Sequence, residues 1–122
     1  MVLRRWVTGI GAGLVLAACG GSGGSPLEPP SGPAVSADTI NIIDNAFGPQ
    51  TVLITQGGTV TWTWAGTNTM QHNVKWASGS VTLPSSPTQA TGTPFDVMFP
   101  QPGTYEFVCT LHAGMDGAVF VQ

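Results

Sequence analysis

Hydrophobic and polar residues alternate along several short stretches of this 122-residue chain. The clearest is Thr-Val-Thr-Trp-Thr-Trp at residues 59–64, where Val60, Trp62 and Trp64 would face inward and the threonines outward. A period of two is typical of a half-buried β-strand. Further short runs lie at 40–42, 51–55, 71–76, 95–99, 104–109 and 118–121, with a shorter candidate edge strand at 80–83.

Glycine and proline recur between these runs, and no stretch after residue 37 keeps a helical period. Several short strands with such punctuation predict an all-β domain, either a sandwich or a barrel. The length of the chain allows a single domain. About 85 residues can bury an adequate core, helped here by the aromatic side chains of Trp62, Trp64, Phe95, Phe99 and Phe107.

The first 18 residues differ in character from the rest. Arg4 and Arg5 precede an apolar run at 6–18, which is too short to span a membrane and predicts an export signal. Residues 16–19, Leu-Ala-Ala-Cys, resemble a bacterial lipobox, in which the cysteine is diacylated and becomes the first residue. The alternative is an ordinary signal peptide with Cys19 incidental. The position of Cys19 directly after the apolar run favours lipidation, so we expect an exported protein anchored to a membrane, facing the periplasm or the cell exterior.

A low-complexity segment follows Cys19. Of the fourteen residues at 20–33, twelve are glycine, serine or proline, a composition that cannot bury enough apolar surface to fold by itself. We therefore expect residues 19–37 to be a flexible tether and residues 38–122 to be the folded domain.

The charge of the mature chain excludes some partners. Once the signal is removed, Lys75 is the sole lysine or arginine against six acidic residues, a formal charge of −5. Nucleic acids and anionic lipids select basic surfaces, so neither is an expected electrostatic partner. A basic protein partner remains compatible with this charge.

Three residues with soft or borderline donor atoms are spaced three apart near the end of the chain: Cys109, His112 and Met115. Thiolate and thioether ligands select copper or zinc over hard ions such as magnesium. Two histidines, one cysteine and a weak axial methionine form the ligand set of electron-transfer copper sites. His72 is the only other histidine of the chain, and it completes the predicted set.

Blander interpretations exist for the same residues. Cys109 alone is typical of a small buried hydrophobe, and a Cys-His pair suggests a nucleophile with its base, although no third, orienting group is evident. A disulfide between Cys19 and Cys109, the only two cysteines, would leave His112 and Met115 unexplained. Three such donors within seven residues, with one distant histidine, favour a metal site.

Residues 105–117, Tyr-Glu-Phe-Val-Cys-Thr-Leu-His-Ala-Gly-Met-Asp-Gly, resemble the copper loop of the cupredoxins, with the short ligand spacing of amicyanin-type loops. The segments at 47–49, 57–62 and 72–74 follow in the family's order. This plastocyanin/amicyanin-like resemblance covers residues 38–122. It implies a Greek-key β-sandwich with one mononuclear type 1 copper ion. It also implies that the side chains of Asn73 and Thr110 tie the two ligand segments together by hydrogen bonds.

The donor count narrows the expected function. The single loop cysteine disagrees with a binuclear copper domain, and two histidines are too few for the second copper of multicopper oxidases or nitrite reductases. Zinc is a less suitable metal for this site, because methionine is a poor zinc ligand. We expect a monomer that is not an enzyme and that passes single electrons between extracytoplasmic redox proteins by cycling Cu(I) and Cu(II). A copper carrier or storage protein, and a copper-free adhesive or structural sandwich, are the alternatives.

Overall fold

The computed structural model describes residues 34–122, so the predicted signal peptide, Cys19 and most of the predicted tether lie outside the described residues. The described part of the chain contains no helix that is long and apolar enough to cross a membrane. Its nine strands are β1 (Val35–Ser36), β2 (Thr39–Ile43), β3 (Ala46–Gly48), β4 (Thr51–Ile54), β5 (Thr59–Trp64), β6 (Lys75–Ser78), β7 (Phe95–Met98), β8 (Gly103–Val108) and β9 (Asp116–Val121).

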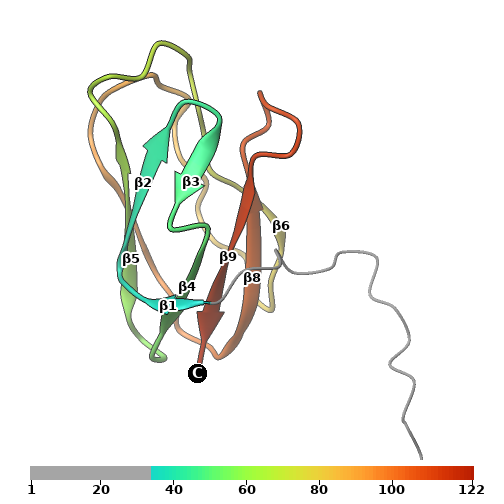
Figure 1. The fold of residues 1–122 in the computed structure, drawn as a ribbon. Helices are drawn as coiled ribbons and strands as arrows, with labels where there is room; N and C mark the ends of the chain where they lie inside the picture. Colours follow the sequence, from blue (N-terminus) through green and yellow to red (C-terminus); the bar gives the residue numbers. More distant parts are fainter. Residues whose placement is uncertain (1–33) are drawn as a thin grey trace, which may run out of the picture.

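The strands form two sheets that pack face to face as a sandwich (Figure 1). One sheet has the order β1-β4-β9-β8-β6 and the other the order β3-β2-β5-β7. Both sheets are mixed, because β1 runs parallel to β4, β4 to β9 and β2 to β5, whereas the other neighbours are antiparallel. The predicted all-β sandwich is confirmed.

The core lies between the sheets and is built on the alternating residues of β5. Val60, Trp62 and Trp64 are buried while the intervening threonines are more exposed, as the alternation predicts. Across the core, the ring of Phe107 in β8 lies 5.3 Å from the ring of Trp62 at an interplanar angle of 88°. This edge-to-face arrangement is one that aromatic pairs prefer, so the two sheets meet through oriented aromatic contacts.

Some strand predictions were wrong in detail. The run predicted at 71–76 forms a strand only as β6, at Lys75–Ser78, and residues 80–83 form none. His72 instead makes an isolated bridge with Gln89. The short strands β1 and β3 were not predicted. Val35 and Ser36 of β1, two residues that the composition assigned to the tether, pair with Val52 and Leu53 of β4.

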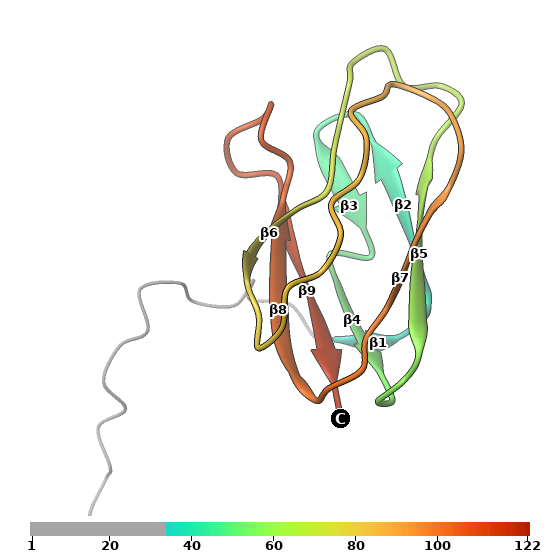
Figure 2. The same cartoon turned by 180° about the vertical axis from the view of Figure 1, so that it is seen from behind.

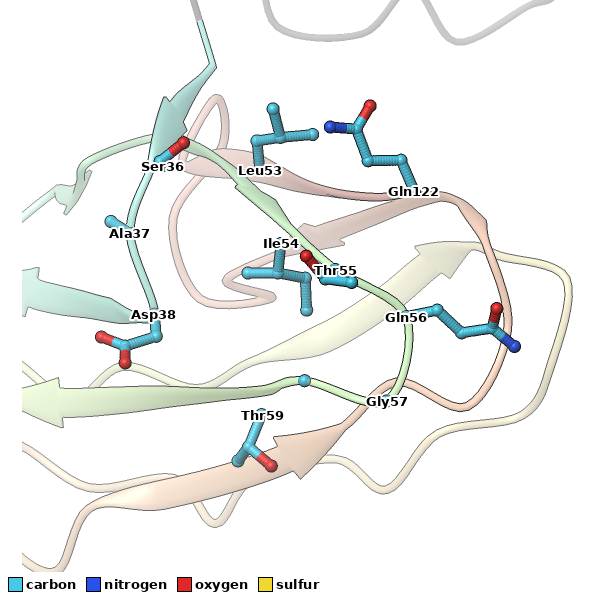
Figure 3. Close-up of a pocket in the computed structure, with 11 residues that line it drawn as sticks. Ser36, Ala37, Asp38, Leu53, Ile54, Thr55, Gln56, Gly57, Thr59 and Gln122 are labelled. Carbon is cyan, nitrogen blue, oxygen red and sulfur yellow. The ribbon is translucent and has the colours of Figure 1, made fainter.

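The two ends of the sandwich differ. The connections β2–β3, β5–β6 and β8–β9 gather at one end, and the β4–β5 turn lies at the other with the end of β9 (Figures 1 and 2). A hollow at this second end is lined by residues such as Leu53, Gly57 and Gln122 (Figure 3). None of its lining residues is a histidine, cysteine or methionine. The predicted metal ligands are at the first end, because the β5–β6 connection carries His72 and the β8–β9 connection carries Cys109, His112 and Met115.

Candidate metal centre

The connection between β8 and β9 folds into a tight loop that brings its two ends together. The backbone N–H of Cys109 donates to the carbonyl of Met115 at 2.9 Å, and the N–H of Met115 donates to the carbonyl of His112 at 3.3 Å. Gly114 adopts a φ of +79°, in the left-handed region where a side chain would be strained. The loop thus places Cys109, His112 and Met115 around one short turn.

His72 comes to this loop from the long connection between β5 and β6. Its backbone exchanges two hydrogen bonds with Gln89, at 3.0 and 3.1 Å, and its carbonyl accepts a third from the indole Nε1–H of Trp64 at 3.2 Å. The side chain of His72 is completely buried. An isolated bridge, in place of the strand predicted at 71–76, thus holds His72 at this buried position.

One sulfur and two imidazole nitrogens converge between these segments. The Sγ of Cys109 lies 3.9 Å from Nδ1 of His72 and 3.5 Å from Nδ1 of His112. The ligand atoms of the three residues all lie within 4.8 Å of one another. Cys109 and Met115 are both 3% exposed, whereas His112 is half-buried. The structure therefore brings together the predicted cysteine and histidines, with Met115 buried in the same loop.

The predicted hydrogen bonds between Asn73 and Thr110 are present. The amide Nδ2 of Asn73 donates to Oγ1 of Thr110 at 2.9 Å, and the N–H of Thr110 donates to Oδ1 of Asn73 at 2.9 Å. A third bond, of 3.2 Å, runs from the same amide to Oγ1 of Thr88. Because Asn73 follows His72 and Thr110 follows Cys109, these bonds fix one ligand segment against the other.

A further residue at this end of the sandwich was missed from the sequence. Asp44, in the turn between β2 and β3, lies with its Oδ1 3.0 Å from Nε2 of His72. The hydrogen bond to His72, followed by those from Thr69 and Met70, holds the pKa of the Asp44 carboxyl well below its usual range. From the sequence, Asp44 was one of several scattered acidic residues. It follows the run predicted at 40–42 by two residues, and no pattern in the sequence distinguishes it from the other acidic residues.

The donor set fits copper. A thiol and two imidazoles, with a thioether in the same loop, are the trigonal set plus axial ligand that copper takes in electron-transfer sites. Cys109 is buried and forms no disulfide with any described residue, so its sulfur remains available. Asp44 could orient His72 as the base of a nucleophilic Cys-His pair, but such a pair needs one imidazole, whereas two imidazoles approach the same sulfur here, as a copper site requires.

Comparison with known proteins supports this interpretation. Residues 35–122 match the family described as "Copper binding proteins, plastocyanin/azurin family". The chain is 35% identical over 92 residues to amicyanin-alpha of Methylorubrum extorquens, covering 74% of this chain and 75% of that protein. It is 30% identical to amicyanin of Paracoccus denitrificans, covering 91% of this chain and 92% of the relative.

Solved structures show the same fold. A purple cupredoxin from Nitrosopumilus maritimus superposes with a TM-score of 0.61 at 27% identity, covering 70% of this chain and all of that one. A reduced Cu(I) form of a variant amicyanin gives a TM-score of 0.60 at 27% identity, covering 73% and 85%. Family match, fold and donor set agree, and the chain therefore belongs to the plastocyanin/azurin family of copper-binding proteins, the cupredoxins, with copper as its cofactor.

Proposed function

We propose that this chain is a type 1 copper electron-transfer protein whose single copper ion is bound by His72, Cys109 and His112, with Met115 as the weak axial ligand. The observation that carries the proposal is the convergence of one thiol and two imidazoles within 4.8 Å at the end of a rigid sandwich. Bound copper would supply the one-electron chemistry by cycling between Cu(I) and Cu(II).

The protein's own contribution is to hold the donors still. His72 is fixed by its bridge to Gln89, and Cys109 is fixed by its backbone bond to Met115. The bonds between Asn73 and Thr110 then limit relative motion of the two segments. Ligands that are held in place by surrounding hydrogen bonds keep one geometry through a change in the charge of the metal, which suits repeated electron transfer.

Transfer also requires a path to a partner. His112 is half-buried, and its neighbours Leu111, Ala113 and Gly114 are exposed and uncharged. A small apolar rim lets a second protein approach the imidazole edge without first removing water from charged groups. We propose that redox proteins dock here and exchange electrons through His112.

The test is to load the protein with Cu(II) and to record its visible absorption and voltammetry. We expect an intense blue band and a reversible one-electron wave, and we expect the Cys109→Ala variant to fold but to lose the band. A copper-loaded protein without the band would refute a copper-thiolate site. A blue protein that gives up copper rapidly to a physiological competitor, without passing electrons to redox proteins, would favour copper carriage or storage.

We further propose that the mature protein begins at a lipidated Cys19, outside the described residues, and that the segment at 20–33, rich in glycine, serine and proline, is a tether that links this anchor to the copper domain. The support is the lipobox-like sequence and the composition of the segment that follows it. Such an anchor would keep the monomeric carrier at an extracytoplasmic membrane surface, near membrane-bound redox partners.

A further inference from the structure

The Asp44 carboxylate contacts the edge of the His72 ring that points away from Cys109. Asp44 lies in the two-residue turn after β2, and its Oδ1 is 3.0 Å from Nε2 of His72, while Nδ1 of the same ring lies toward the sulfur of Cys109. The two nitrogens of one buried imidazole therefore have different partners. A carboxylate can only accept, so Nε2 carries the proton and Nδ1 presents its lone pair to the donor cluster.

Asp44 is itself held by contacts that do not involve His72. Its Oδ2 accepts from the backbone N–H of Thr69 at 2.9 Å and from the Thr69 hydroxyl at 2.8 Å, and its Oδ1 also accepts from the N–H of Met70 at 3.2 Å. Four hydrogen bonds thus converge on one carboxylate. Because three of them come from Thr69 and Met70, the position of the carboxylate does not depend on its bond to His72.

We infer that Asp44 is the positioning residue of the His72 imidazole, selecting the tautomer and ring orientation that direct Nδ1 at the copper site and strengthening His72 as a donor. The inference rests on the proposed copper site. A carboxylate that accepts from the far nitrogen makes a ligating imidazole more basic, and such partners typically contribute 10- to 100-fold to metal affinity. The added negative charge favours Cu(II) over Cu(I), so Asp44 lowers the reduction potential.

A test must separate two contributions of Asp44. One is its hydrogen bond to His72, and the other is the set of hydrogen bonds by which it holds Thr69 and Met70 in the β5–β6 connection. Asp44→Ala removes both. Thr69→Val removes only the hydroxyl bond to Oδ2 and leaves the atoms that join Asp44 to His72. Asp96→Asn controls for net charge, because the Asp96 carboxylate accepts from Thr61 on β5 and not from a histidine. Asp44→Val, which also lacks an acceptor oxygen, replaces Asp44→Ala if that variant does not fold.

The first measurement uses the metal-free protein, in which long-range proton–nitrogen NMR reports the tautomer of each histidine. We expect His72 in the wild type, Thr69→Val and Asp96→Asn to be protonated at Nε2. In Asp44→Ala we expect a mixture of both tautomers. A single Nε2-protonated form retained in Asp44→Ala would overturn the inference, and it would do so whether or not copper binds.

The second measurement is the reduction potential of the copper-loaded proteins. In Asp44→Ala we expect about a tenfold loss of Cu(II) affinity relative to Cu(I), the lower end of the range for such partners, which raises the potential by ~59 mV. Thr69→Val and Asp96→Asn should shift it by much less. Equal shifts in Thr69→Val and Asp44→Ala would mean that Asp44 only holds the loop. A wild-type protein that fails to form a blue site would refute the proposed function, whereas the NMR result would still decide the role of Asp44.

Discussion

Replacing Asn73 by alanine removes the hydrogen bonds to Thr110 that join the His72 segment to the Cys109 segment. The resulting loss of stability can be worked out from the structure. The Asn73 side chain is 3% exposed and makes three hydrogen bonds, two with Thr110 and one with Thr88. A typical intramolecular hydrogen bond contributes about 1 kcal/mol net. Thr88 and Thr110 are exposed, so water can satisfy the groups that Asn73 leaves behind. We therefore expect a loss of about 2 to 3 kcal/mol in the free energy of unfolding.

This loss is measurable in the metal-free protein by guanidinium chloride unfolding, followed by tryptophan fluorescence. For an m-value of about 3 kcal/mol/M, the midpoint should fall by roughly 1 M with an unchanged slope. The matched control is Thr88→Val, which removes only the 3.2 Å bond and should cost about 1 kcal/mol or less. If Asn73→Ala is no less stable than Thr88→Val, the hydrogen bonds to Thr110 contribute nothing to the free energy of unfolding, and the reasoning is refuted.

Three further outcomes are expected. Gly117→Ala should destabilise the sandwich by about 1–3 kcal/mol, because a Cβ there would overlap the Phe107 ring. Gly66→Ala, whose Cβ would meet nothing within 4 Å, is the control, and equal midpoints for the two variants would contradict the packing argument. Met115→Gln should keep the blue colour but lower the reduction potential, because an oxygen donor favours Cu(II); unchanged voltammetry would place Met115 outside the coordination sphere. Cys19→Ala should release the protein from membranes or block its processing, because it removes the residue that would carry the acyl chains on which stable anchoring depends. Membrane fractionation in which the variant stays bound would argue against a lipid anchor.

The sequence predicted those parts of the fold whose signal is local. The alternation at Thr59–Trp64 reports a strand with one buried face, and the structure shows that strand with the predicted burial. The loop ligands were also predictable, because Cys109, His112 and Met115 lie within seven residues and their chemistry is specific. In both cases the determining residues are neighbours in sequence.

The missed features depend on contacts between distant segments. His72 lies in a run that looks like a strand, yet its backbone partner is Gln89 in a loop with no β pattern. Asp44 contacts His72 only because the β2–β3 turn lies against the β5–β6 connection, which carries both Thr69 and His72. Nothing in the residues around Asp44 distinguishes it from an acid on the solvated surface, since a single carboxylate carries no periodicity or spacing.

The position of β9 imposes an order of events on the maturation of this protein. β9 follows every other strand in sequence, yet it lies inside its sheet, parallel to β4 and antiparallel to β8. A chain emerging from one end to the other, whether from a ribosome or through a membrane, therefore lacks the strand that joins the two halves of this sheet. Until β9 pairs with β8, nothing holds Met115 close enough to Cys109 for their backbone hydrogen bond to form. Copper acquisition must then be a late step, because a partly emerged chain has no assembled donor cluster to capture the ion.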